Sequence, residues 1–284
     1  MGKLCLMPPS DLGIIAGSKS LPLIFAREAR QKGLQRLVAV GFRNETDPQL
    51  EPLVDTMIWL RVGQLSKMIA AFTDNGISQC VMLGQIAPRN LFDVRPDLRA
   101  MGLLLRIKEK NAHTLFGALV NELKSEGIEV IEPTPWLQSI LASTSFHLGP
   151  ELNAEQRSDV EFGYRIAREV SALDIGQTVV VKDGTVLAVE GFEGTDQCLE
   201  RGGQLAGSKG GAVAVKLAKT NHDMRFDIPC IGARTVETCM NAGISVLAIE
   251  AGRTFVLDRP ELDGLLRKRR FVLTAIGDPS VRTP

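Results

Sequence analysis

The stretch LGIIAGSKSLPLIFAREARQKGLQRLVAVGF, residues 12–42, decides the fold class of the N-terminal half. It begins with a short apolar run that ends in Gly17 and predicts a buried strand. The run at 21–33 has a proline near its start and a glycine at its end, which indicates a helix. The apolar run at 36–42 predicts a second strand. Strands that alternate with helices in this way favour a parallel sheet.

The alternation continues along the first half of the chain. Residues 64–76 predict a helix, and residues 79–84 and 128–132 predict strands. Between those two strands, leucines and a methionine share the faces of two further helices (Leu98, Met101 and Leu105; Leu115, Leu119 and Leu123). We therefore expect an α/β protein whose N-terminal domain, residues 1–133, is a Rossmann-like parallel sheet covered on both faces.

The second half of the chain has a more mixed pattern. Residues 133–151 contain two early prolines and a late Gly-Pro, and we interpret residues 134–151 as the linker between domains. Two β-branched runs flank Asp183-Gly184, a dipeptide typical of a hairpin. A C-terminal domain of mixed α/β type, residues 152–284, is expected, with helices at 154–174, from 195 and at 234–242, and further strands at 212–218, 245–250 and 253–257.

Composition excludes several classes of protein. Among the 284 residues, 33 Lys and Arg balance 33 Asp and Glu, so a nucleic-acid partner is not expected. The five cysteines form no C-x-x-C pair and the three histidines share no metal-ligand spacing, which argues against a disulfide framework and against zinc. No signal peptide and no apolar run of about 20 residues is evident. We expect a cytoplasmic protein, with a homodimer as the default assembly.

The turn after the first predicted strand is a candidate ligand site. Gly17 lets a ligand approach the backbone, and Ser18 can donate a hydrogen bond at the start of a helix, where phosphates bind. A tight turn with a serine cap explains the same residues equally well. A dinucleotide-dependent dehydrogenase fits poorly, because the G-x-G-x-x-G spacing is absent and no acidic residue ends the second strand.

A group of charged residues follows the predicted hairpin. Glu190 closes a strand of buried character, so a purely solvated role explains it poorly. Asp196 lies in the first turn of a predicted helix, where compensation of the helix dipole is the simpler interpretation. Glu193 precedes it, and Lys216 and Lys219 come at the end of the next predicted strand.

The segment NHDMRFDIPCIGART, residues 221–235, carries the strongest catalytic candidate. Asp227 precedes Ile228-Pro229, and the proline stops any helix there. A carboxylate beside a lysine, an arginine and a helix start suits phosphate chemistry with Mg²⁺, which takes one or two carboxylates plus phosphate oxygens. From the residues alone, a salt-bridged surface loop is the more favoured alternative.

Four segments together resemble the LpxI-type UDP-2,3-diacylglucosamine pyrophosphatases of lipid A biosynthesis. They are LGIIAGSKSLPLIFAREAR, ALDIGQTVVVKDGTVLAVEGFEGTD, FDIPCIGARTVE and AGISVLAIEAGRTFVLDR, and they span nearly the whole chain. The resemblance implies two domains that hold a lipid-linked nucleotide in the cleft between them. It also implies Mg²⁺-dependent hydrolysis, in which water attacks the α-phosphorus and yields UMP and 2,3-diacylglucosamine 1-phosphate.

The resemblance also assigns roles to residues. It implies that Asp227 is catalytic and, with Glu190, a metal ligand. The expected substrate-binding residues, some matched to the family and some taken from the charge pattern above, are Gly17, Ser18, Glu193, Gly194, Thr195, Asp196, Lys216 and Lys219. A lipid substrate implies transient contact with the inner face of the inner membrane, and the segment MGLLLRI (101–107) lines an apolar crevice or else packs as a core helix. The alternative is a non-catalytic nucleotide- or lipid-binding regulatory protein on the same fold.

Overall fold

The computed structural model describes residues 9–86, 96–107, 112–218, 223–267 and 270–277. The chain forms two compact units. Unit 1 comprises the chain up to Gln138 together with the separate segment Asp223–Asp227, and unit 2 comprises the remainder from Ser139 onward. A five-residue segment from the second half of the chain therefore folds with the first half.

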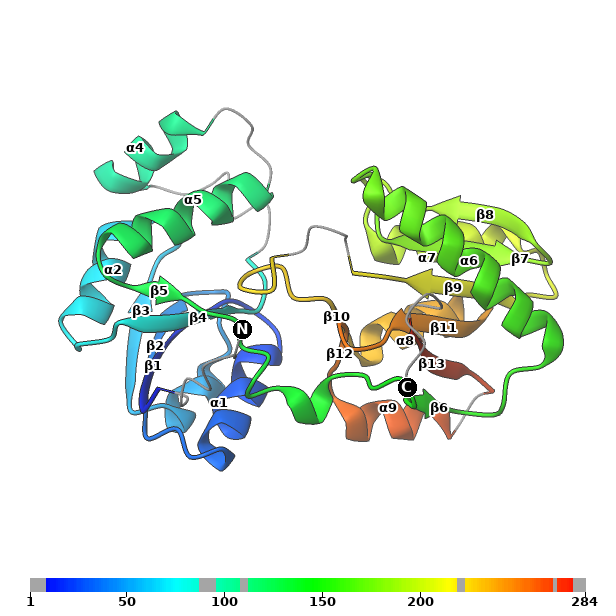
Figure 1. Ribbon diagram of the computed structural model, residues 1–284, viewed down its shortest axis with the longest axis horizontal. Coiled ribbons are helices and arrows are strands. Elements are labelled where there is room, and N and C mark those ends of the chain that lie inside the picture. The colour runs from blue at the N-terminus through cyan, green and yellow to red at the C-terminus, as the bar shows by residue number, and fades with distance from the viewer. Residues whose placement is uncertain (1–8, 87–95, 108–111, 219–222, 268–269, 278–284) are drawn as a thin grey trace, which may run out of the picture. The chain divides into compact units, whose positions relative to one another are not determined.

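Unit 1 is built on a five-stranded parallel sheet with the order β3-β2-β1-β4-β5 (Figure 1). Its strands are β1 (Asp11–Ala16), β2 (Arg36–Phe42), β3 (Thr56–Leu60), β4 (Gln79–Leu83) and β5 (Glu129–Val130). The central strand β1 is buried on both faces, and Ile14 pairs with Ala39 on one side and Val81 on the other. The strand order reverses between β1 and β4, which is where open α/β sheets bind ligands.

Helices cover both faces of this sheet. The helices among the described residues of unit 1 are α1 (Leu21–Gln31), the 3₁₀ helix η1 (Pro48–Leu53), α2 (Leu65–Thr73), α4 (Leu98–Arg106) and α5 (Ala112–Ser125). Phe72 of α2 and Leu123 of α5 share one buried cluster with Ile15 and Val38 of the sheet. Figure 1 shows α1 on the opposite face. The predicted Rossmann-like parallel domain is thus confirmed.

Unit 2 is built on a six-stranded mixed sheet with the order β6-β13-β11-β9-β7-β8. Strands β9, β11 and β13 run parallel, whereas β7, β8 and β6 each pair antiparallel with a neighbour. The bounds are β6 (His147–Leu148), β7 (Thr178–Lys182), β8 (Thr185–Val189), β9 (Ala212–Lys216), β11 (Ile244–Glu250) and β13 (Val272–Ile276), and β10 (Cys230–Ile231) pairs with β12 (Phe255–Val256) in a separate two-stranded sheet. The predicted mixed character is confirmed.

The predicted hairpin joins β7 to β8. Asp183 and Gly184 both have positive φ, 49° and 70°, as the tight two-residue turn requires. The buried carboxylate of Asp159 accepts hydrogen bonds from the backbone N–H groups of both residues, at 2.9 and 2.8 Å. This acid therefore has a structural role in holding the turn.

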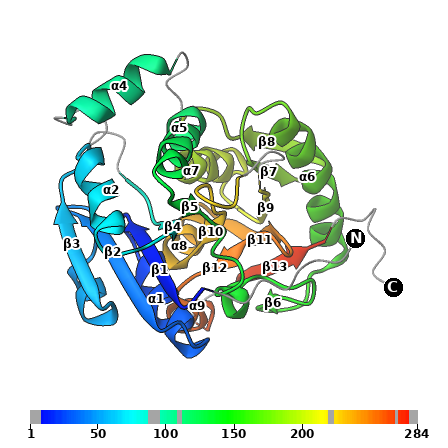
Figure 2. The ribbon, with the colours of Figure 1, turned by 60° about the vertical axis from the view of Figure 1, so that its left-hand side comes forward.

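Unit 2 has three layers. Helix α6 (Ala154–Ala172) packs its Val160, Tyr164 and Ala167 on one face of the sheet. The other face packs against α7 (Thr195–Leu205), α8 (Ala233–Asn241) and α9 (Arg259–Leu266), as Figure 2 shows. Within the described parts of both units, no helix is both long and apolar enough to cross a bilayer.

Three strands of the large sheets have no counterpart among the sequence predictions, and one of them, the two-residue strand β6, lies in the segment interpreted as the linker. Strand β3 is the edge of its sheet, and four of its five residues are only partly buried, so its apolar pattern is weak. Strand β13 follows the basic run that begins at Arg267 and is only five residues long. Strands β3 and β13 join their sheets by parallel pairing with other segments of the chain, which no local pattern reveals.

Candidate functional site

The turn of Gly17 and Ser18 lies at the reversal point of the sheet in unit 1. The N–H of Gly17 donates to Leu83 O at 2.7 Å, and the N–H and hydroxyl of Ser18 both donate to Gln85 O at 2.7 Å. The end of β1 is therefore tied to the segment after β4. Ser18 does not cap α1, whose N-cap is Ser20, and the side chain of Ser20 makes no capping hydrogen bond. The two polar groups of Ser18 hold the turn closed.

Gly17 is required at this turn because two backbone segments approach closely. A Cβ added there would lie 2.5 Å from Gln85 O. We expect Gly17→Ala to lower the free energy of unfolding by about 1–3 kcal/mol, as measured by urea denaturation. Gly117→Ala is the matched control, since nothing lies within 4 Å of its added Cβ, and alanine favours the helix by up to about 1 kcal/mol. Equal stability of the two variants would contradict this account.

Asp227 ends the short segment that folds with unit 1, and its side chain is exposed. The segment is a tight turn in which the N–H groups of Phe226 and Asp227 donate to Asp223 O at 3.1 and 2.8 Å. The guanidinium of Arg225 donates to the Asp223 carboxylate at 2.8 and 2.6 Å. The ring of Phe226 stacks on Phe116 of α5, with centroids 5.8 Å apart. An aromatic contact thus holds the turn and presents Asp227 at its surface.

Unit 2 contains a largely buried polar group that includes three of the predicted site residues. Glu190 is 6% exposed and Lys216 is 8% exposed. Thr195 connects them, because its hydroxyl donates to Glu190 Oε1 at 3.0 Å and accepts from Lys216 Nζ at 2.7 Å. The other carboxylate oxygen, Glu190 Oε2, is buried and has no hydrogen-bond partner among the described residues. A buried carboxylate oxygen without a partner is costly, and a bound ion or water is one way to satisfy it.

The sheet and helix α7 together assemble this group. Lys216 pairs with Thr178 in the register of β7 and β9, and the N–H of Glu190 donates to Thr178 O at 2.8 Å. Residues opposite one another share a face, so Glu190, Thr178 and Lys216 form a row across three neighbouring strands on the side covered by α7. Gly194, with φ +85°, begins α7 and places Thr195 in its first turn beside this row. A helix N-terminus and a lysine together suit an anionic ligand.

The row includes one residue that the sequence analysis missed. The hydroxyl of Thr178 is fully buried and, like Glu190 Oε2, lacks a hydrogen-bond partner within the described chain. The sequence offers one signal for it. Thr178 is a polar residue in a valine-rich strand, and it lies two residues before Val180, whose side chain packs against α7. Phe192, which is fully exposed between Glu190 and Glu193, was also not named from the sequence.

The other predicted acids of this region are engaged in surface contacts. Glu193 accepts from the N–H of Gly191 at 3.0 Å and from Arg201, and this arginine lowers the pKa of the Glu193 carboxyl. Asp196 lies in the first turn of α7 and pairs with Arg234 of α8 at 3.1 Å. Lys219 lies outside the described residues. The structure thus brings Glu190, Thr195 and Lys216 together. Glu193 and Asp196 instead form separate ion pairs with Arg201 and Arg234.

Cys198 lies close to the buried polar group but is a poor candidate for a nucleophile. Burial, followed by the charge of Glu190, raises the pKa of its thiol to about 12, so the thiolate is scarce at neutral pH. The described residues contain no cluster of three or more His, Cys, Asp or Glu side chains that could form a complete protein cage for a metal. A Mg²⁺ site with few protein ligands remains compatible with this arrangement.

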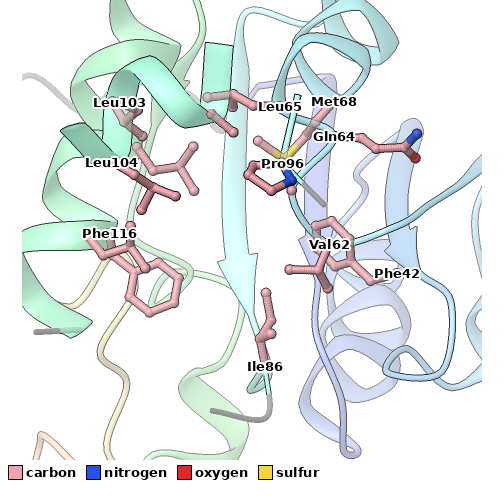
Figure 3. A pocket seen from close by; sticks show the side chains of 14 residues that line it. Phe42, Val62, Gln64, Leu65, Met68, Ile86, Pro96, Leu103, Leu104 and Phe116 are labelled. Atoms are coloured by element: carbon pink, nitrogen blue, oxygen red, sulfur yellow. The ribbon is translucent and has the colours of Figure 1, made fainter. Parts of the chain in front are cut away.

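An apolar pocket of about 150 Å³ lies in unit 1 between α2, α4 and α5 (Figure 3). Leu103 and Leu104 of the segment 101–107 line it, as one of the two interpretations of that segment expects. Phe116 also lines the pocket and is the ring on which Phe226 stacks. Phe116 therefore contacts both the pocket and Phe226, the residue that directly precedes Asp227.

Comparisons with known proteins match both halves of the chain. The family described as the LpxI N-terminal domain matches residues 11–140, and the LpxI C-terminal domain matches residues 144–274. The UDP-2,3-diacylglucosamine pyrophosphatase LpxI of Caulobacter vibrioides is 30% identical over 260 residues, covering 87% of this chain and 91% of that protein. Among solved structures, phosphoribosylglycinamide synthetase from Anaerococcus prevotii aligns with 64% of this chain and 39% of its own, at 10% identity and a TM-score of 0.26.

Proposed function

Because the chain belongs to the LpxI family, we propose that it hydrolyses the pyrophosphate of UDP-2,3-diacylglucosamine to UMP and 2,3-diacylglucosamine 1-phosphate. The observation that carries the proposal is the 30% identity to a pyrophosphatase of that name over nearly the whole of both chains. The buried group of Glu190, Thr195 and Lys216 supports it, since a lysine and a helix N-terminus suit a phosphate.

Asp227 has the role of the catalytic carboxylate in this proposal. It orients the attacking water at the α-phosphorus and accepts its proton, which an exposed carboxylate held in a tight turn is able to do. Lys216 and the N-terminal turn of α7 bind the pyrophosphate and offset its negative charge. Gly17 and Ser18 contact the nucleotide or the sugar.

Mg²⁺ is the cofactor that fits the residues present. Glu190 Oε2 is a buried carboxylate oxygen without a hydrogen-bond partner among the described residues, and Mg²⁺ takes one or two carboxylates together with phosphate oxygens. We assign Glu190 and Asp227 as its ligands. The bound ion would stabilise the negative charge on the phosphate oxygens in the transition state.

The assay for this function measures UMP release from purified protein incubated with UDP-2,3-diacylglucosamine and Mg²⁺. Hydrolysis in ¹⁸O-labelled water is expected to place the label in UMP, because the α-phosphorus is the proposed point of attack. Label in the lipid phosphate would contradict that mechanism. Binding of the substrate without any release of UMP would instead support the alternative of a regulatory binding protein.

The apolar pocket of unit 1 is the proposed site for an acyl chain of the substrate. Leu103→Trp narrows this pocket and is expected to lower kcat/KM for the diacylated substrate about tenfold or more. The rate with UDP-glucosamine, which has no acyl chain, should not change. Leu205→Trp, at an exposed position on α7, is the matched control. Equal loss with both substrates would show damage to the fold or to the phosphate site and would contradict the assignment.

A further inference from the structure

Helix α4 carries a line of exposed apolar side chains. Leu98 is 86% exposed, Met101 46% and Leu105 84%. Their spacing of three and four residues places them on one side of the helix. Elsewhere in the described chain, large exposed apolar residues occur singly or in pairs on different elements of unit 2 (Leu173 and Ile175, Val186, Phe192, Leu205). Single exposed residues need no explanation, whereas a continuous line of them does.

Contacts on the opposite side of α4 fix the orientation of the helix on unit 1, so Leu98, Met101 and Leu105 point away from the core of that unit. Ala100 is buried, and Leu103 and Leu104 line the apolar pocket. Arg99 donates to Glu122 of α5 at 2.6 Å and also pairs with Glu126. Asp97 caps the helix by accepting from the N–H groups of Ala100 at 2.9 Å and Ser66 at 2.7 Å. These contacts all involve the inner side and the N-terminus of α4, and the outer side of the helix is exposed.

We propose that the outer face of α4, formed by Leu98, Met101 and Leu105, inserts into the headgroup region of an anionic lipid bilayer. The side chains are aliphatic and belong to one short amphipathic helix, as in interfacial membrane contacts. Arg106 is exposed at the end of the same helix, so a basic side chain accompanies the apolar ones. Cations beside an apolar face are attracted to anionic headgroups.

The proposed membrane contact and the apolar pocket lie on the two sides of the same helix, α4. The inner side chains Leu103 and Leu104 line the pocket, and Leu104 is itself 37% exposed. An acyl chain that leaves the bilayer at α4 therefore meets apolar side chains of this helix before it meets water. The choice of a lipid surface as the occupant rests on the proposed function, whereas the binding measurement below does not involve the reaction.

The test compares binding to vesicles of phosphatidylglycerol and phosphatidylethanolamine by co-sedimentation. The double variant Leu98→Asp/Leu105→Asp is expected to lose binding about tenfold or more, since both side chains would no longer enter the apolar boundary. Leu173→Asp/Leu205→Asp, at exposed positions of unit 2, is the matched control and should bind as the wild type does. Vesicles of phosphatidylcholine alone should bind the wild type more weakly.

Two outcomes would overturn the proposal. One is equal vesicle binding by the wild type and the α4 variant. The other is a wild-type dimer, seen by analytical ultracentrifugation, that the α4 variant converts to a monomer, with no vesicle binding by either protein. Hydrolysis of substrate dispersed in detergent micelles should be unaffected in the α4 variant. Absence of hydrolysis by the wild type in micelles would count against the proposed function and leave the vesicle result intact.

Discussion

Asp227→Ala is expected to lower kcat about 10²–10⁴-fold and to leave the affinity for UDP-2,3-diacylglucosamine nearly unchanged. The carboxylate is exposed at the end of a tight turn, and that turn is closed by hydrogen bonds between backbone groups, which the substitution keeps. The loss therefore reports on the chemistry rather than on stability. Initial rates of UMP release give kcat, and calorimetric titration with the substrate gives the affinity.

The control for this variant is Asp74→Ala, another exposed aspartate of unit 1, at the end of α2. It should keep the wild-type rate, which shows that loss of one negative charge from the unit is not sufficient. Phe226→Ala tests the anchor of the turn, because it removes the ring that stacks on Phe116 while keeping the carboxylate. A fully active Asp227→Ala variant would remove Asp227 from the catalytic role.

Glu190→Gln is the second variant with a large expected effect. It keeps the size of the side chain and its bond to Thr195, but it removes the charge from the buried carboxylate whose Oε2 lacks a partner among the described residues. We expect the Mg²⁺ concentration for half-maximal rate to rise at least about tenfold. Stability is expected to change little, since a neutral amide is easier to bury than a carboxylate, whereas the buried Lys216 loses a nearby negative charge.

Glu200→Gln is the matched control for this prediction, because Glu200 is exposed on α7 of the same unit. Its Mg²⁺ dependence and its unfolding in urea should equal those of the wild type. An unchanged Mg²⁺ requirement in Glu190→Gln would show that Glu190 is not a ligand. A marked loss of stability without any change in Mg²⁺ dependence would make the buried polar group purely structural.

Local patterns in the sequence predicted the strands and helices that have strong local signals. The segment 12–42 forms β1, α1 and β2 because its apolar runs are separated by residues that start and stop a helix. The Asp183-Gly184 turn was predicted for the same reason, since only residues that tolerate positive φ fit there. Strand β3 was missed because an edge strand is only partly buried and shows a weak pattern.

The candidate site was predictable only in part, since contacts between distant residues assemble it. Glu190 could be singled out because it closes a buried strand, but Thr178 could not be distinguished from its neighbours without the register of β7 and β9. The segment Asp223–Asp227 folds with unit 1 and contacts it through the stacking of Phe226 on Phe116, two residues that are far apart along the chain. No local periodicity encodes such a contact.

The segment Asp223–Asp227 has a consequence for genes that encode only one half of this protein. A fragment that ends near Gln138 lacks the aspartate that its own fold would hold, and a fragment that begins near Ser139 carries that aspartate without Phe116 to anchor it. Neither fragment is expected to be active when it is produced alone. Co-expression of the two fragments should restore hydrolysis only if the segment Asp223–Asp227 of the C-terminal fragment binds to the N-terminal fragment.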